Sequence, residues 1–163
     1  MRIRIAEIGD AASIAAMYNV EVVESTATFD LEPRSVAKQR EWLLRRSGAH
    51  VVLVAEDQVG DGVIGFASLS PYKDRPAYST TVESSVYVHR DARGRGVAKA
   101  LMTELLETAR THGFHAVIAR IADSQSASLT LHEKVGFTQV GVEREVGRKF
   151  GRWLDVAIMQ VML

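Results

Sequence analysis

The sequence of 163 residues contains no cysteine. Disulfide bridges, zinc–thiolate sites and thiol nucleophiles are therefore excluded, which fits a reducing compartment. Twenty basic side chains balance twenty acidic ones, so net charge gives no reason to expect nucleic acid or an anionic membrane as a partner. No stretch approaches the roughly 18 apolar residues of a membrane span, and the opening MRIRIAEIGD lacks the apolar run of a signal peptide. We expect a cytoplasmic protein.

Proline is scarce as well. Its three residues lie in the segments EPRS and SPYKDRPAY, and no flexible linker, internal repeat or low-complexity tract divides the chain. Apolar residues make up 47%, enough for a sizeable core, so one domain over residues 1–163 is the simplest interpretation. No catalytic metal is expected, because metal-ligand spacing with nearby acidic residues is missing around His50, His89, His112 and His115.

The hydrophobic pattern predicts a mixed α/β layer architecture, because strands and helices alternate along the chain. Predicted N-caps for the first two helices are Asp10 and Ser35. The expected elements are a strand at Arg2–Ala6, a helix after Asp10, a helix from Ser35 through Arg46, a hairpin of Val51–Glu56 and Val63–Leu69 around the turn DQVGDG, a strand at Thr81–Val88, a long amphipathic helix ended by Gly113, a strand at Ala116–Ile121, a helix at Ser126–Val135 stopped by Gly136, and strands at Thr138–Val146 and Trp153–Val161.

The most informative segment is HRDARGRGVAK, which lies between a predicted strand and the long helix. The first turn of a helix presents unpaired N–H groups and the positive end of the helix dipole. Glycines allow a bulky anion to approach the backbone, and Arg93, Arg95 and Lys99 add positive charge. This combination predicts a site for a phosphate or diphosphate.

Two common nucleotide loops do not fit this segment. A GxGxxG loop would need glycine where Lys99 stands, and the Lys-Ser/Thr pair of a Walker loop is missing, which argues against an ATP-dependent enzyme. A solvated Arg/Gly loop that only turns the chain is the simpler alternative.

The spacing R-G-R-G-V-A resembles the acyl-CoA loop of the GNAT superfamily of N-acetyltransferases. The resemblance implies the GNAT fold, a mixed sheet of about seven strands with about four helices and splayed central strands, here Thr81–Val88 and Ala116–Ile121. It also implies acetyl-CoA as co-substrate. The contacts carried over are the backbone of Val86 and Val88, together with Arg93, Gly94, Arg95, Gly96, Ala98, Lys99, Ser128 and Gln125, where many relatives have asparagine.

Six segments resemble more narrowly the phosphinothricin and methionine sulfoximine acetyltransferase branch: IAEIGDAASIAAMYN, ESTATF, KDRPAY, TVESSVYV, SLTLHEKVGF and VGRKFGRWLD. They imply acetyl transfer to the amino group of a small amino-acid-like substrate, in a ternary complex, by a homodimer. A protein or peptide N-acetyltransferase and a non-catalytic acyl-CoA sensor remain the alternatives.

Glu83 and His132 are the candidate catalytic residues. A carboxylate in a strand rich in β-branched residues is unfavourable unless it faces water or has a functional role. By resemblance, Glu83 is the general base, acting through a water. His132 shares a helical face with Ser128 and is assigned to polarising the site or to protonating the leaving sulfur. An exposed structural glutamate and a half-buried structural histidine are the competing interpretations.

Four residues are candidate substrate contacts by resemblance. Two cations and a phenol, Lys73, Arg75 and Tyr78, suit a carboxylate or a phosphinate-like group, and Phe29 is a candidate apolar wall. A solvated charged loop and ordinary packing are the alternatives. Arg148, Lys149 and Arg152 form a second basic cluster, either near a dimer interface or in a solvated turn.

Overall fold

A computed structural model of the chain describes residues 1–46, 48–57, 62–123 and 125–163. Regular elements follow one another in the predicted order, with three 3-10 turns added. They are β1 (Arg2–Ile5), η1 (Ile8–Asp10), α1 (Ala11–Glu24), α2 (Val36–Leu44), β2 (Val52–Glu56), β3 (Val63–Pro71), η2 (Pro76–Tyr78), β4 (Thr81–Val88), η3 (Arg90–Ala92), α3 (Val97–Thr111), β5 (Ala116–Ala122), α4 (Ser126–Lys134), β6 (Thr138–Lys149) and β7 (Arg152–Met162).

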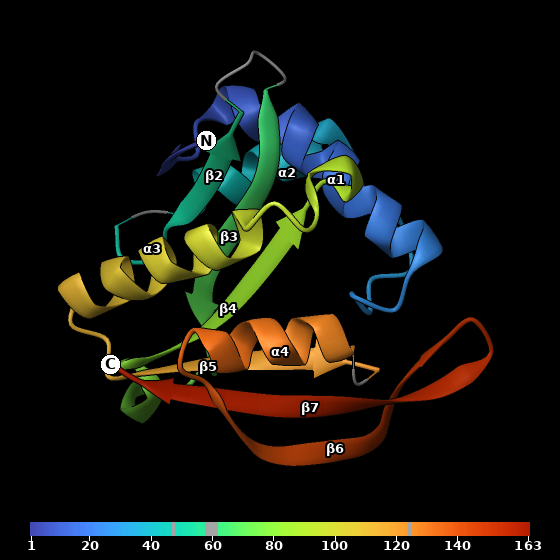
Figure 1. Cartoon of the computed structure of the whole chain (residues 1–163), viewed down its shortest axis with the longest axis vertical. Helices are drawn as coiled ribbons and strands as arrows, with labels where there is room; N and C mark the ends of the chain where they lie inside the picture. The colour runs from blue at the N-terminus through green and yellow to red at the C-terminus, as the bar shows by residue number, and fades with distance from the viewer. Residues whose placement is uncertain (47, 58–61, 124) are drawn as a thin grey trace.

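The strands form one seven-stranded sheet in the order β1-β2-β3-β4-β5-β7-β6 (Figure 1). Strands β4 and β5 are parallel, and the other neighbouring pairs are antiparallel. A parallel pair needs a crossover connection, which α3 provides between β4 and β5. The mixed α/β sheet predicted from the sequence is therefore confirmed.

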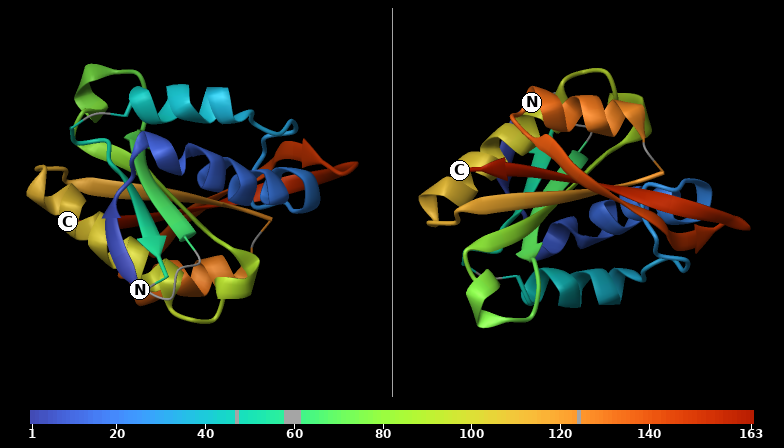
Figure 2. Two further views of the ribbon diagram at one scale, coloured as in Figure 1. Left: turned by 90° about the horizontal axis from the view of Figure 1, so that it is seen from above. Right: turned by 90° about the horizontal axis from the view of Figure 1, so that it is seen from below.

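Helices cover both faces of the sheet, with α1 and α2 on one side and α3 and α4 on the other (Figure 2). Under α3 lies the larger core, which includes Leu101 and Leu105 of the helix and Val82 and Val117 of the sheet. Below α1 and α2 lies a second core built from residues such as Ile14, Leu43, Val54 and Phe66. Because side chains alternate along a strand, the two cores share β2, β3 and β4.

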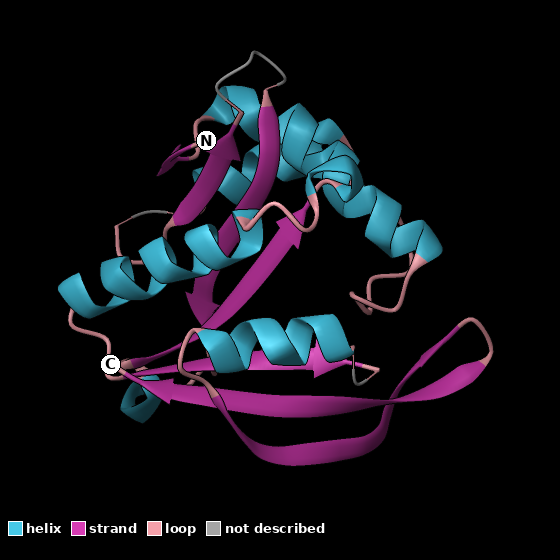
Figure 3. Cartoon of the chain, in the orientation of Figure 1, coloured by secondary structure: helices cyan, strands magenta, loops and turns pink. Residues whose placement is uncertain are grey.

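The central parallel pair is short. Its register runs from Thr81 opposite Ala116 to Ser84 opposite Ala119 and ends there. Beyond that point β4 stays paired with β3 and β5 stays paired with β7, so the two strands diverge (Figure 3). The predicted splay of the central strands is present and opens the sheet near its middle.

Tertiary contacts override sequence expectations at two helix ends. Asp10 precedes α1 as predicted, but its side chain does not cap that helix. Its carboxylate instead accepts hydrogen bonds from the Glu7 N–H and from Arg4. The second helix ends at Leu44 rather than at Arg46, because the Arg46 guanidinium donates to the Leu69 carbonyl at 2.6 Å.

Other local predictions hold. Ser35 caps α2, accepting a hydrogen bond from the Lys38 N–H at 3.2 Å. The hairpin of β2 and β3 is present, although residues 58–61 of its predicted DQVGDG turn lie outside the described residues. The final hairpin of β6 and β7 is longer than predicted, reaching Lys149 and Arg152. In the described part of the chain, no helix combines the length and apolarity that crossing a membrane requires.

Gln39 of α2 provides a test of core packing. Its side chain is 1% exposed, and neither atom of its amide has a hydrogen-bond partner among the described residues. Leaving buried polar atoms unpaired costs about 1–3 kcal/mol. Gln39→Met keeps the length of the side chain and removes both polar atoms. We expect it to raise the free energy of unfolding by about 1 kcal/mol or more, measured by urea denaturation.

Gln39→Glu is the matched control, and it should lower the unfolding midpoint because it buries a charge without a partner. A lower midpoint for Gln39→Met would contradict this account.

Candidate active site

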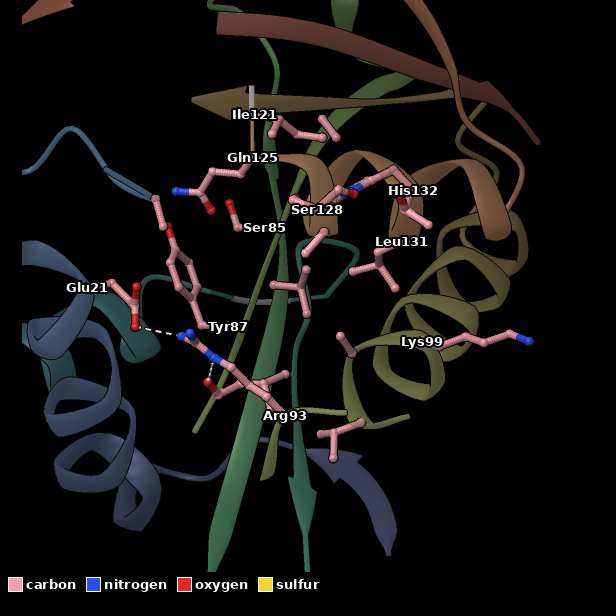
Figure 4. A pocket seen from close by; sticks show the side chains of 18 of the residues that line it. Glu21, Ser85, Tyr87, Arg93, Lys99, Ile121, Gln125, Ser128, Leu131 and His132 are labelled. Atoms are coloured by element: carbon pink, nitrogen blue, oxygen red, sulfur yellow. Dashed lines mark hydrogen bonds and ion pairs between the residues drawn. The ribbon is translucent and has the colours of Figure 1, made fainter. Parts of the chain in front are cut away.

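A groove of about 860 Å³ opens where β4 and β5 part. Its walls are the end of β4, the start of α3, the end of β5, helix α4 and the C-terminal turn of α1. Figure 4 shows Ser85 of β4 between Gln125 and Ser128, with Tyr87 and Glu21 on one side of the groove and His132 of α4 on the other. The groove therefore passes from one face of the sheet to the other.

The rim of the groove at α3 is shaped for an anion. Gly94 and Gly96 have φ angles of +75° and +80°, in the left-handed region that glycine adopts without strain. Gly96 occupies the N-cap position and has no capping side chain, so the first N–H groups of α3 lack intrahelical partners. Among the described residues other than its immediate chain neighbours, no atom lies within 4 Å of where a Cβ would stand on either glycine. A phosphate group fits this rim.

The exposed backbone edge of β4 lies along the same groove. The His89 N–H donates to the Ile64 carbonyl on the β3 side. Because successive residues of a strand direct their backbone groups to opposite sides, those of Val86 and Val88 face the gap left by β5. Both residues line the groove. The edge can pair with an amide-containing chain laid beside it.

The three predicted cations lie at different places. The Arg93 guanidinium donates to Glu21 Oε1 at 2.7 Å and to the Val88 carbonyl at 3.4 Å. Arg95 pairs with Asp57 at 2.6 Å and is not a groove-lining residue. Lys99 is exposed and lines the groove. The structure thus brings Arg93 and Lys99 to the groove and directs Arg95 toward the end of β2.

Glu83 lies one residue before the groove-lining part of β4 and is partly buried. Its side chain faces the side of the sheet that carries α1 and α2, because it alternates with Ser84 and shares a face with Tyr87, which packs on Phe66. Burial raises the pKa of Glu83, with nearby Glu143 adding to the rise and Arg120 opposing it. This is the environment expected of a carboxylate that must accept a proton near neutral pH.

His132 lies on the opposite face, in α4. It is 4% exposed, and its ring meets Phe137 edge to face at 5.0 Å between centroids. Nδ1 lies 2.8 Å from the Ser128 carbonyl oxygen. A carbonyl only accepts, so Nδ1 carries the proton and Nε2 of the neutral ring has a lone pair. Burial lowers the pKa of His132, although this hydrogen bond raises it in part.

The remaining predicted contacts lie both inside and outside the groove. Gln125 and Ser128 line it, and the Gln125 amide lies 3.4 Å from Thr26 Oγ1. Lys73, Arg75 and Tyr78 are exposed in the β3–β4 loop and do not line it.

Phe29 also lies outside the groove lining and packs on Gly147 of β6 so closely that a Cβ there would fall 2.2 Å from its ring.

The second basic cluster is not a solvated turn throughout. Lys149 is 4% exposed, and its ammonium group donates to the Thr28 carbonyl at 2.9 Å. Arg152 binds Asp123 at 3.0 Å, and Asp123 also accepts from Thr26. The β6–β7 hairpin is thereby tied to the loop after α1.

Among the groove-lining residues that sequence reasoning missed are Glu21, Tyr87 and Arg120. Glu21 accepts hydrogen bonds from Arg93 and Ser25. Burial raises its pKa, but Ser25, Arg93 and Arg90 together outweigh burial and hold the pKa below its ordinary value. The signal was available: Glu21 falls on the apolar stripe of α1, and Arg120 interrupts the apolar strand AVIARIA.

In the described ranges of the chain, no three His, Cys, Asp or Glu side chains are grouped so that they could hold a metal ion.

Comparison with known proteins identifies the family. The profile of the acetyltransferase (GNAT) family matches residues 14–137. A phosphinothricin N-acetyltransferase of Streptomyces coelicolor is 41% identical over 150 residues, which cover 91% of this chain and 88% of the relative. An L-methionine sulfoximine/L-methionine sulfone acetyltransferase of Pseudomonas aeruginosa is 39% identical over 162 residues, which cover 99% of this chain and 94% of the relative.

A solved structure agrees with these relatives. The phosphinothricin acetyltransferase of Sinorhizobium meliloti, in complex with acetyl-CoA, has a TM-score of 0.95 and 37% identity, covering 99% of this chain and 88% of that one. The family accounts for the fold and the parted strands, and the resemblance inferred from the sequence is confirmed. The chain belongs to the acetyltransferase (GNAT) family and is an acetyl-CoA-dependent N-acetyltransferase.

Proposed function

We propose that this enzyme acetylates the amino group of a small amino-acid-like molecule of the phosphinothricin, methionine sulfoximine or methionine sulfone type. The observation that carries the proposal is the parting of β4 and β5 beyond Ser84, which joins an anion-binding rim on one side to the neighbourhood of Glu83 on the other. The names of the relatives support the substrate class. The acetyl group passes directly from coenzyme A to the amine in a ternary complex.

The co-substrate is held along the groove. Its diphosphate lies at the start of α3, where unpaired N–H groups and the helix dipole favour negative charge. Its pantetheine arm pairs with the free backbone edge of β4. The residues proposed for these contacts are Val86, Val88, Arg93, Gly94, Arg95, Gly96, Ala98, Lys99, Gln125 and Ser128.

Glu83 is the proposed general base. An ammonium group cannot attack a thioester, so it must first lose a proton, which passes to Glu83 through a water molecule. Because Glu83 lies just outside the groove lining, a bridging water suits the geometry. As the new N–C bond forms, the C–S bond breaks and coenzyme A leaves as a thiolate. Holding the amine beside the thioester supplies much of the rate.

His132 is proposed to polarise the site rather than to donate a proton. Its Nδ1–H is bonded to the Ser128 carbonyl, and burial disfavours the imidazolium form. The neutral ring therefore offers a lone pair at Nε2, which can accept a hydrogen bond but cannot protonate sulfur. The thiolate then takes its proton from solvent.

The β3–β4 loop is proposed to contact the phosphinate-like group of the substrate. Lys73 lies over the rings of Tyr72 and Tyr78, at 4.9 and 5.6 Å from their centroids. This arrangement holds an ammonium group at the surface of the loop, and Arg75 adds a second cation. Phe29 is proposed as the apolar wall opposite them.

A homodimer and a cytoplasmic location complete the proposal. The edge strand β6, its partner β7 and the turn between them expose large apolar side chains, which a second copy would cover. They are Val140, Val142, Val146, Phe150 and Trp153.

A thiol-release assay tests the proposal. With acetyl-CoA, we expect release of free thiol with methionine sulfoximine, methionine sulfone or phosphinothricin, and little with a short peptide that has a free N-terminus. Turnover of the peptide alone would favour a protein N-acetyltransferase. Binding of acetyl-CoA in isothermal titration calorimetry, with no thiol release from any amine, would favour a non-catalytic sensor.

A further inference from the structure

Arg120 occupies a position on β5 that the assigned contacts leave unused. It comes directly after Ala119, the last residue of β5 that pairs with β4, and it lines the groove. Glu83 is in register with Ile118, and residues two apart on a strand face the same side. Arg120 and Glu83 therefore share the face of the sheet opposite α3 and α4, on adjoining strands at the point where they part.

The present partner of Arg120 is a carboxylate. Its NH1 lies 3.2 Å from Glu143 Oε1 of β6, and its NH2 bonds to the other carboxylate oxygen. The two side chains are 36% and 40% exposed. Such a pair contributes at most about 1 kcal/mol. The guanidinium group can therefore exchange Glu143 for another carboxylate at little cost, and its planar fork suits two-point binding of that group.

The other cations that line the groove differ from Arg120 in their partners or in the face of the sheet on which they lie. Arg93 is held by Glu21, whose side chain is 8% exposed. Lys99 and Lys134 belong to α3 and α4, on the other face of the sheet. Among the described groove-lining residues, this leaves Arg120 as the cation beside Glu83 whose acidic partner is accessible to solvent.

We propose that Arg120 binds the α-carboxylate of the substrate in exchange for Glu143, while the α-amino group lies next to Glu83. The inference rests on the proposed function and deepens it, because it defines the substrate class as α-amino acids with a free carboxylate. In such a molecule one carbon separates the amine from the carboxylate, so a single small ligand reaches both strands. The N-terminal residue of a peptide has its carboxyl group in an amide bond and therefore offers Arg120 no negative charge to bind.

The experiment compares each amino acid that the wild type acetylates with the corresponding carboxamide. For the wild type, we expect kcat/KM for the acid to exceed that for the amide by about 10- to 100-fold, as for a hydrogen-bonded charge pair. Arg120→Gln should reduce this acid-to-amide ratio to near one. Arg120→Lys, which keeps the charge without the fork, should restore part of it. Glu143→Gln frees Arg120 and should lower KM for the acid severalfold.

The pH dependence of kcat/KM is a second measurement, and a mere loss of packing around Arg120 would not shift it. Arg120 opposes the rise of the Glu83 pKa, and Glu143 adds to it. Arg120→Gln should therefore move the acidic limb of kcat/KM to higher pH, and Glu143→Gln should move it to lower pH. Circular dichroism and the Kd for acetyl-CoA serve as controls for folding.

The outcomes separate this inference from the proposed function. An acid-to-amide ratio that is equal in wild type and Arg120→Gln overturns the role of Arg120, even if amino acids are acetylated. If the wild type acetylates no amino acid, the proposed function fails instead. If Arg120→Gln does not fold, Glu143→Gln provides the test. An unchanged KM for the amino acid in that variant overturns the proposed exchange of Glu143 for the substrate carboxylate.

Discussion

Glu83→Gln is expected to lower kcat by about two to four orders of magnitude, the usual contribution of a general base. Glutamine keeps the size and the hydrogen-bonding capacity of the side chain but cannot accept the proton that the ammonium group must lose. The contacts that we propose for the diphosphate and the pantetheine arm do not involve Glu83, so the Kd for acetyl-CoA should stay within about twofold of wild type.

Steady-state thiol release and isothermal titration calorimetry measure the two quantities. Wild-type kcat/KM should increase with pH through an apparent pKa above the ordinary glutamate value, because burial raises the pKa of Glu83 and the deprotonated form is active. That limb should vanish in Glu83→Gln. An unchanged kcat would remove Glu83 from the mechanism.

Ala98→Glu is expected to weaken acetyl-CoA binding by about 100-fold, which corresponds to about 2.8 kcal/mol. Ala98 lies in the first turn of α3 and lines the groove. A carboxylate there repels the diphosphate. The same charge interacts favourably with the helix dipole and should stabilise the free protein by about 0.3–1 kcal/mol. Affinity and stability therefore change in opposite directions.

Calorimetry gives the Kd and thermal unfolding gives the stability. Ala98→Gln is the matched control: it has nearly the same size and no charge, so it should weaken binding much less. Equal losses in the two variants would indicate a steric effect, and normal affinity in Ala98→Glu would show that the diphosphate binds elsewhere.

Much of the fold could be predicted because its signals are local. Ser35 and the helix-ending Gly113 and Gly136 mark boundaries by the conformations and hydrogen bonds that these residue types favour. Contacts between distant segments could not be predicted in this way. The Arg46 side chain bonds the Leu69 carbonyl, and Lys149 is buried against the loop after α1, although lysine is ordinarily an exposed residue.

Part of the site was predictable only where a motif resembled a family. The roles of Glu83 and His132 were predicted in this way and stay predictions, whereas the phosphate site at Arg93–Lys99 was predicted from the helix start and its glycines and cations. The different roles that we propose for the two faces of the sheet could not be predicted. They depend on where β4 stops pairing with β5, which is a property of strand register that no single segment encodes. The sequence marks Arg120 as a break in an apolar strand, but its place next to the strand of Glu83 follows only from the register of β4 and β5.

The unpaired edge of β4 makes the free enzyme an incomplete sheet. If the arm of coenzyme A takes the place of the missing strand, the ligand contributes to holding the two halves of the molecule together. A ligand that binds only the native state stabilises it by about 2.7 kcal/mol at a hundred times its Kd. The midpoint of thermal unfolding should then rise with the concentration of acetyl-CoA.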